Sequence, residues 1–480
     1  MYNPHRPNIP QGPPESHGYG DQGAHARTGA HHTHDGHGHG SSHHQKGNTG
    51  YDSKPLIVKH RVGGWLPRNH AVVERYISKL IDKVKQDKRS LNELHPTVVE
   101  FKNLVDTTPA LRMGFTQMFE QVPHKPPYND DPTLEPQIRD YDTMFRAFDY
   151  IITHAIPYED NDLVGFPINA ILDWPMGTDA GVATFLVPSV NAQFKKMFDA
   201  WAEYLSSPAS REYLTSEENG WFGPQANVHL PNFAETYECD PSAEYHGFKS
   251  WDDFFTRKFR DGVRPVEFAD DNDIINSACE SSVYRIARDV KARDRFWLKG
   301  EPYSLLDMLN NDPYADQFVG GTVYQAFLSA YKYHRWHSPV NGVIDRVEMV
   351  PGTYYAESPA MGFENPEGPD PAGPNWSQSY ITSIAARALI WIRSDNPDIA
   401  LMCFMAVGMS EVSTCDITIK EGDRIRKGDQ LGMFHFGGST HCLLFRSGVE
   451  ITFDEQYEHP ESEVLLNAPI ATVGERRRRH

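Results

Sequence analysis

Residues 436–440, FGGST, hold the first group that could do covalent chemistry. Two glycines between apolar runs are typical of a hairpin turn. They also give Ser439 two neighbours without a Cβ, so a hydroxyl can approach the Gly438 carbonyl at an angle that a side chain would block. The segment is not a nucleophile elbow, because G-x-S-x-G needs a glycine where His441 stands. The pattern alone leaves a turn and a self-reacting peptide bond both open.

The second group is YHRWHSPVNG, residues 333–342, in which His334 and His337 stand three residues apart. Two histidines at this spacing could bind a metal, act as acid and base, or lie in a polar core. No third histidine, cysteine or carboxylate stands at a recognisable metalloenzyme spacing, so we expect no metal site. An acid–base pair needs a pKa near neutrality, which histidine has without perturbation.

Composition disfavours several classes of protein. The 480 residues carry a formal net charge of −19, which disfavours general nucleic-acid binding and docking on anionic membranes. No apolar run approaches the ~18 residues of a membrane helix, and the first residues lack the pattern of a secretory signal. The five cysteines are scattered without a CxxC pair, which suits a reducing compartment. We therefore expect a cytoplasmic globular protein.

Three regions of the chain differ in composition and in the spacing of their apolar residues. Residues 1–55 form a His/Gly-rich tail with too little apolar surface to become ordered, and its histidines are expected to be solvated. Residues 60–245 repeat apolar side chains at three- and four-residue spacing, which predicts a helical accessory domain. Residues 247–474 contain short alternating runs and turns such as EGDRIRKGDQLG, which predict antiparallel strands and hairpins. The fold class is therefore α+β.

Four motifs, in order along the chain, resemble the pyruvoyl-dependent phosphatidylserine decarboxylase family. They are GFKSWDDFFTRKFRDGVRPV (247–266), KGEPYSLLDML (299–309), YHRWHSPVNGVIDRVEMVPGTYY (333–355) and KGDQLGMFHFGGST (427–440). The helical region upstream, together with SACES at 277–281, is most similar to the fungal branch that includes soluble L-tryptophan decarboxylases. The resemblance implies a β-rich decarboxylase domain, with sandwich and hairpin elements, behind the helical accessory domain.

The resemblance also implies that the chain is made as a precursor and cuts itself between Gly438 and Ser439. The Ser439 hydroxyl attacks the Gly438 carbonyl to give an ester, and β-elimination leaves a dehydroalanine that hydrolyses to a pyruvoyl group and ammonia. The pyruvoyl ketone forms a Schiff base with the substrate amine and withdraws electrons as the carboxylate leaves. Pyridoxal phosphate is then not needed, and residues 1–438 and 439–480 stay associated.

Family matches assign roles to three further residues. His337 matches the histidine that deprotonates the serine during self-cleavage, and His334 matches the one that assists decarboxylation or reprotonation. A serine–histidine pair needs a third group that holds the imidazole tautomer. The phospholipid enzymes have an aspartate there, in P-A-D-G, whereas this sequence has Glu280 in A-C-E-S. Glu280 is either that third group or a structural carboxylate.

The favoured function is a self-processing decarboxylase of a free L-amino acid, with L-tryptophan to tryptamine as the first expectation. The alternative in the same class is a phosphatidylserine decarboxylase that makes phosphatidylethanolamine. A non-catalytic binding protein with this fold is the alternative from another class, and the intact Gly438-Ser439 pair and both histidines disfavour it. The sequence defines neither the substrate side chain, nor the oligomeric state, nor the role of the tail.

Overall fold

The computed structural model describes residues 70–122, 138–159, 167–294, 303–329, 331–356, 377–409, 411, 414–436, 439–460 and 462–474. The predicted tail at 1–55 lies outside the described residues, and so do Gly437 and Gly438. The described residues, which lie between 70 and 474, belong to one compact unit. The predicted division of this unit into an accessory and a catalytic domain stays a prediction.

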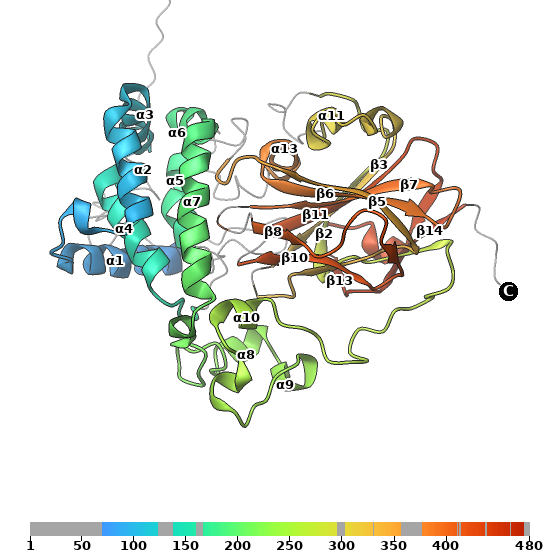
Figure 1. The fold of residues 1–480 in the computed structure, drawn as a ribbon, viewed down its shortest axis with the longest axis horizontal. Helices are drawn as coiled ribbons and strands as arrows, with labels where there is room; N and C mark the ends of the chain where they lie inside the picture. The colour runs from blue at the N-terminus through green and yellow to red at the C-terminus, as the bar shows by residue number, and fades with distance from the viewer. Residues whose placement is uncertain are drawn as a thin grey trace, which may run out of the picture. The chain divides into compact units, whose positions relative to one another are not determined.

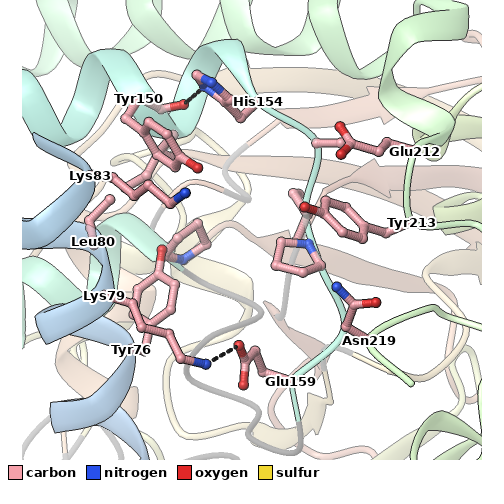
Figure 2. A pocket seen from close by; sticks show the side chains of 15 residues that line it. Tyr76, Lys79, Leu80, Lys83, Tyr150, His154, Glu159, Glu212, Tyr213 and Asn219 are labelled. Atoms are coloured by element: carbon pink, nitrogen blue, oxygen red, sulfur yellow. Dashed lines mark hydrogen bonds and ion pairs between the residues drawn. The ribbon is translucent and has the colours of Figure 1, made fainter. Parts of the chain in front are cut away.

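The first half of the described chain is helical, as the residue spacing predicted (Figure 1). Its longer helices are α1 (His70–Gln86), α2 (Pro96–Thr107), α3 (Pro109–Glu120), α4 (Tyr141–Thr153), α5 (Pro167–Met176), α6 (Asp179–Phe185) and α7 (Pro188–Leu205). Short helices follow at α8 (Ala226–His229), α9 (Phe233–Thr236) and α10 (Trp251–Phe255). Helix α1 and the end of α4 border an open pocket of about 530 Å³ (Figure 2).

Proline and aromatic residues explain where these helices begin and how they pack. Helices α2, α3 and α7 each begin with proline, which needs no amide partner in a first turn. Their apolar faces meet at Phe101, whose ring centroid lies 5.9 Å from Phe115, 5.2 Å from Phe145 and 4.9 Å from Phe194. These rings cross edge to face, which is a favourable geometry for aromatic pairs. The apolar side chains that repeat along this region therefore include an aromatic core between the helices.

The second half is built from antiparallel strands, which confirms the predicted β-rich region and the α+β class. The strands are β1 (Ile274–Asn276), β2 (Ser281–Ala287), β3 (Thr322–Leu328), β4 (Arg335–His337), β5 (Gly342–Val350), β6 (Arg387–Ser394), β7 (Leu401–Val407), β8 (Thr414–Ile417), β9 (Arg424–Ile425), β10 (Gln430–His435), β11 (Ser439–Phe445), β12 (Ile451–Phe453), β13 (Glu463–Val464) and β14 (Pro469–Val473). Helices α11 (Leu305–Met308) and α13 (Gln378–Ile384) lie between them in sequence.

The strands form one large sheet and two small ones. The eight-stranded sheet has the order β13-β2-β3-β11-β7-β6-β5-β9, and the three-stranded sheets have the orders β1-β14-β12 and β4-β10-β8. Alternate residues of β7 join different cores: Cys403 and Met405 join the core that includes the helices, whereas Met402 and Phe404 join the core that includes the small sheets. The large sheet is therefore covered on both faces. No described helix is long and apolar enough to cross a membrane.

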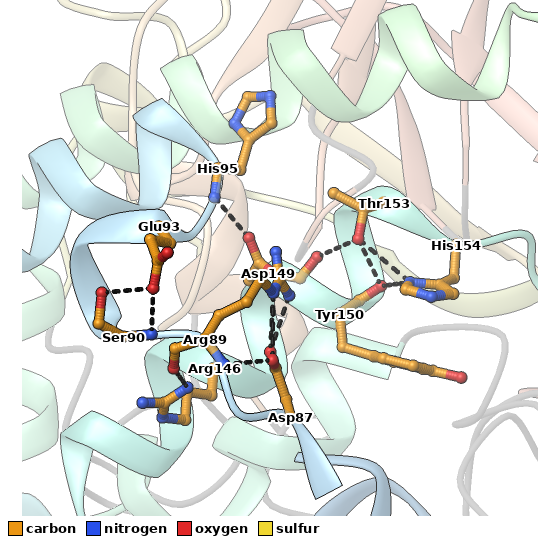
Figure 3. Close-up of polar contacts among 10 residues, drawn as sticks. All are labelled: Asp87, Arg89, Ser90, Glu93, His95, Arg146, Asp149, Tyr150, Thr153 and His154. Atoms are coloured by element: carbon orange, nitrogen blue, oxygen red, sulfur yellow. Dashed lines mark hydrogen bonds and ion pairs between the residues drawn. The ribbon is translucent and has the colours of Figure 1, made fainter.

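Asp149, on α4, joins the end of α1 to the start of α2 (Figure 3). Its carboxylate is buried and accepts hydrogen bonds from the Arg89 guanidinium at 2.6 Å and from the His95 backbone amide at 2.5 Å. Arg89 also pairs with Asp87 at 2.8 Å. Because a buried charge needs such partners, this carboxylate fixes how three helices meet.

We expect Asp149→Ala to lower the free energy of unfolding by about 1–3 kcal/mol, because the His95 amide loses its acceptor and Arg89 loses one of its two carboxylate partners. Urea unfolding followed by circular dichroism measures this change. The control is Asp142→Ala on the same helix, whose side chain is 56% exposed and whose loss should change stability by less than ~1 kcal/mol. Equal effects of the two substitutions would contradict the role of Asp149.

Candidate functional site

Ser439 is the first residue of β11, the strand that lies between β3 and β7 in the large sheet. Its backbone pairs with Leu328, the last residue of β3. The preceding strand, β10, ends at His435 and belongs to a three-stranded sheet. The predicted cleavage point therefore lies in the connection between two sheets, and the strand register holds its C-terminal side.

Phe436, the last described residue before the two glycines, is anchored by rings from the helices. It is 4% exposed, and its ring centroid lies 4.4 Å from Trp201 on α7 and 4.9 Å from Trp251 on α10. Its φ of 50° is left-handed, which is unfavourable for a residue with a bulky side chain. Backbone strain of this kind clusters at functional sites and persists where packing overrides it.

His334 belongs to the same aromatic cluster. Its ring stacks on Phe255 with centroids 4.2 Å apart, and Phe255 lies 6.0 Å from Phe436. The side chain is fully buried, and neither ring nitrogen makes a hydrogen bond of ordinary geometry to a described residue. Burial, helped by the nearby Arg257 charge, holds the pKa of His334 well below its ordinary value. The ring is therefore neutral, with polar atoms that the described fold does not use.

His337, on β4, is held at both ring nitrogens. Nδ1 lies 2.7 Å from the Gly428 carbonyl oxygen, and Nε2 lies 2.9 Å from the Tyr333 hydroxyl. Because a carbonyl can only accept, Nδ1 carries the proton and Nε2 accepts from Tyr333. Burial lowers the pKa of His337 to about 4. The ring is thus neutral at pH 7, with its basic nitrogen defined by two partners.

Glu280 is not among those partners. Its two oxygens accept hydrogen bonds from the Arg264 guanidinium at 2.6 and 3.0 Å, and one of them also accepts from the Leu466 amide at 2.8 Å. Within the described part of the chain, no hydrogen bond joins Glu280 to His337. A bidentate arginine pair in a nearly buried place satisfies this carboxylate.

The backbone nevertheless connects this carboxylate to the histidine. The His337 amide donates to the Ala278 carbonyl at 2.8 Å, two residues before Glu280. Tyr333 and Gly428, which sequence reasoning missed as partners, hold the ring in the way that Glu280 was expected to. Tyr333 stands in the quoted YHRWH motif, but its distance from His337 in space could not be read from spacing.

Glu411 is a second group that the sequence did not single out. It is 2% exposed, and its oxygens accept from the Ile168 amide and the Tyr355 hydroxyl, each at 3.0 Å. Together with Phe436 and Trp201 it lines a small cavity. Burial raises the pKa of Glu411 to about 7. A carboxyl poised near neutrality beside the FGGST segment is typical of functional sites.

His441 lies two residues after Ser439 and is fully buried. Its ring lies between Tyr324 and Phe404, with centroids 6.0 and 5.9 Å away, and its nitrogens have no hydrogen-bond partner among the described residues. Burial lowers its pKa to about 3. The described residues contain no cluster of three or more histidine, cysteine, aspartate or glutamate side chains that could hold a metal.

Comparisons with known proteins match most of this chain. One family model, described as phosphatidylserine decarboxylase, matches residues 95–230, and a second of the same description matches residues 251–466. Decarboxylase iboD of Amanita muscaria is 48% identical over 321 residues, which cover 64% of this chain and 91% of the relative. The L-tryptophan decarboxylase of Psilocybe cubensis is 36% identical over 437 residues, 87% of this chain and 96% of the relative.

A phospholipid enzyme is more distant. Phosphatidylserine decarboxylase proenzyme 3 of Schizosaccharomyces pombe is 32% identical over 209 residues, which cover 44% of this chain and 20% of the relative. The relatives from Amanita muscaria and Psilocybe cubensis, by contrast, match over more than nine-tenths of their own length. The chain is therefore a decarboxylase, and it belongs to the phosphatidylserine decarboxylase family, in the branch of the fungal tryptophan decarboxylases.

Proposed function

We propose that this chain is a self-processing decarboxylase of a free aromatic L-amino acid, with L-tryptophan as its first substrate, and that it makes its pyruvoyl group from Ser439. The observation that carries the proposal is the FGGST segment at the start of a central strand, whose Phe436 shares an aromatic cluster with the buried, neutral His334. The nearly full-length match to L-tryptophan decarboxylases supports the substrate class. The family models named for phosphatidylserine keep that lipid as the second candidate.

In self-processing, the chain supplies every group. The neutral Nε2 of His337 takes the proton of the Ser439 hydroxyl as the oxygen adds to the Gly438 carbonyl, and then gives it to the Ser439 nitrogen, which leaves as an amine to give an ester. Loss of the Ser439 Cα proton and of the ester oxygen then releases residues 1–438 as a carboxylate and leaves dehydroalanine. Water converts this residue to the ketone and ammonia.

The surroundings fit a small carbonyl group at this place. Neither buried ring nitrogen of His334 makes a hydrogen bond of ordinary geometry to a described residue, and the ring shares an aromatic cluster with the segment that ends at Phe436. A pyruvoyl group supplies an electrophilic ketone that accepts the electron pair left when carbon dioxide departs. His334 holds the proton that the substrate Cα then receives, and the buried rings exclude water from this carbon.

Glu280 enters the proposal as a positioning residue. Its carboxylate ties Arg264 to the Leu466 amide, and the segment that carries it accepts the His337 backbone amide through Ala278. The group thus fixes the backbone of His337, while Tyr333 and Gly428 fix its ring. Glu280 would thus still help to orient His337, as the family match implied, but through the backbone and not through a direct hydrogen bond.

The two products of cleavage are proposed to stay together. The fragment 439–480 would contribute β11 between β3 and β7, β13 beside β2, and β14 beside β1. Each of these strands pairs with residues of the larger fragment. We also place the protein in the cytoplasm, which suits five cysteines that are all free.

Ser439→Ala is expected to remain one chain of 54.5 kDa, because no hydroxyl is left to attack. The unchanged protein should release residues 439–480, roughly 4.8 kDa, with an N-terminus blocked to Edman sequencing as a ketone. Intact-mass spectrometry reads both results. Ser447→Ala, at an exposed serine eight residues away, is the control and should be cleaved normally. A wild-type chain that stays intact while it decarboxylates would rule out the pyruvoyl mechanism.

His337→Ala should slow cleavage by ~10²–10⁴-fold, the usual contribution of a positioned general base. His334→Ala should still be cleaved but should form little amine, because its proton is needed only after cleavage. A time course of precursor disappearance after translation in vitro, followed by an amine assay, separates the two steps.

A pH profile provides a further check on His337. Its pKa of about 4 predicts a cleavage rate that is constant between about pH 8 and pH 5.5. Below that range the rate should fall as the ring is protonated and can no longer accept the serine proton. Equal loss of cleavage in His337→Ala and His334→Ala would contradict the separate roles given to the two histidines. A cleavage rate that falls near pH 6.5 would contradict the assignment of His337 as the base.

The processed protein should release carbon dioxide and tryptamine from L-tryptophan in detergent-free buffer, and added pyridoxal phosphate should have no effect. Phenylhydrazine should inactivate the enzyme, because it reacts with ketones. Mass spectrometry of the amine products, with other aromatic amino acids and phosphatidylserine vesicles in parallel, measures the preference. Turnover of phosphatidylserine without turnover of any amino acid would establish the second candidate instead.

A further inference from the structure

The pocket between α1 and α4 lies outside the site described above. It measures about 530 Å³, within the ~300–1,000 Å³ typical of small-molecule sites. Its walls come from α1, from the end of α4 with the residues that follow it, from Pro167 and from residues 212–219. Strands β3, β4, β10 and β11 contribute no described residue to its lining.

Opposite charges face this pocket from two sides. Figure 2 shows Lys79 and Lys83 projecting from α1, and Glu212 on the opposite wall. Lys79 is already paired with Glu159 at 3.4 Å. Among the described contacts Lys83 has no anionic partner, and Glu212 has no cationic partner. Both side chains are exposed, and Glu212 also accepts a hydrogen bond from the Tyr213 hydroxyl. The pocket thus presents one positive and one negative side chain without an ion-pair partner among the described residues, and these charges are complementary to those of a zwitterion.

Tyrosines surround the negative side. Glu212 lies close enough to Tyr150 and Tyr213 that its charge adds to burial in raising the pKa of both phenols. Tyr150 is held in place by His154, which stacks on it with centroids 3.9 Å apart and a ring angle of 17°. A carboxylate beside fixed aromatic rings is a good acceptor for an ammonium group, through charge pairing and cation–π attraction.

The pocket adjoins the processing site through two hydrogen bonds. The Tyr331 hydroxyl, three residues before His334, donates to the Glu159 carbonyl at 3.0 Å. The Ile168 amide, next to the lining residue Pro167, donates to Glu411 at 3.0 Å. A ligand in the pocket would therefore lie one contact away from segments that pack around FGGST.

We propose that this pocket binds a free aromatic amino acid as its zwitterion, separately from Ser439. The ammonium lies at Glu212 among the tyrosines, the carboxylate lies at Lys83, and the ring packs against Tyr76 and Leu80. The ligand class is that of the proposed function, on which the choice of an aromatic side chain rests. The expected ammonium and carboxylate of the ligand, however, follow from Glu212 and Lys83 in the pocket. The ligand is not proposed to form a covalent bond with the protein.

Titration calorimetry on the full-length Ser439→Ala chain tests this proposal, because that chain cannot form a covalent adduct at residue 439. L-Tryptophan should bind. Lys83→Gln should weaken L-tryptophan about tenfold, the value of one lost charge-assisted contact, and should leave tryptamine unchanged, since tryptamine has no carboxylate. Glu212→Gln should weaken both ligands about tenfold.

Matched controls are Lys85→Gln on α1 and Glu203→Gln on α7, which are exposed and lie outside the lining. They should bind both ligands as the parent does, and unfolding midpoints should agree across all variants. Absence of L-tryptophan binding, or binding that neither Lys83→Gln nor Glu212→Gln changes, would overturn the proposal. Binding of O-phospho-L-serine in place of L-tryptophan would also overturn it.

Failure here can be told apart from failure of the proposed function. Amine formation is measured on the processed wild-type enzyme, whereas pocket binding is measured on the unprocessed chain. If the enzyme forms tryptamine but ligand binding does not depend on Lys83 and Glu212, the proposed pocket is rejected and the proposed function stands. Binding with that dependence, but no amine product, would support the pocket and reject the decarboxylation of this amino acid.

Discussion

The contact of Phe436 with Trp201 and Trp251 is the constraint on which the site depends. These rings belong to helices far away in sequence, and they fix the residue that immediately precedes Gly437 and Gly438. On the other side of the glycines, the pairing of Ser439 with Leu328 fixes the start of β11. The FGGST segment is therefore held on both sides of its glycines, by aromatic packing before them and by strand register after them.

Burial also sets the charge state of the site. His334, His337 and His441 are all held neutral because a low-dielectric surrounding disfavours the imidazolium form. For Glu411 the same effect acts in the opposite direction, and it raises the pKa of the carboxyl to about 7. A site of this kind suits chemistry that depends on which atom holds a single proton.

Local patterns predicted the parts of the fold that depend on local physics. The three- and four-residue apolar spacing predicted the helices, and the short alternating runs with turns predicted the antiparallel strands. FGGST and YHRWH could be found because each is a contiguous motif. The partner of Glu280 could not be found in this way, because Arg264 and Leu466 reach it from 16 residues before and 186 residues after. Glu411 was missed for the same reason, since only tertiary packing makes it buried.

The position of β11 between two neighbours has a consequence for the identity of each molecule. An inner strand can leave only if two ladders of backbone hydrogen bonds break and two new sheet edges become exposed. Exchange of the short fragment between molecules would require that both partners unfold. With the proposed cleavage, each molecule would therefore retain its own fragment 439–480 for as long as it stays folded.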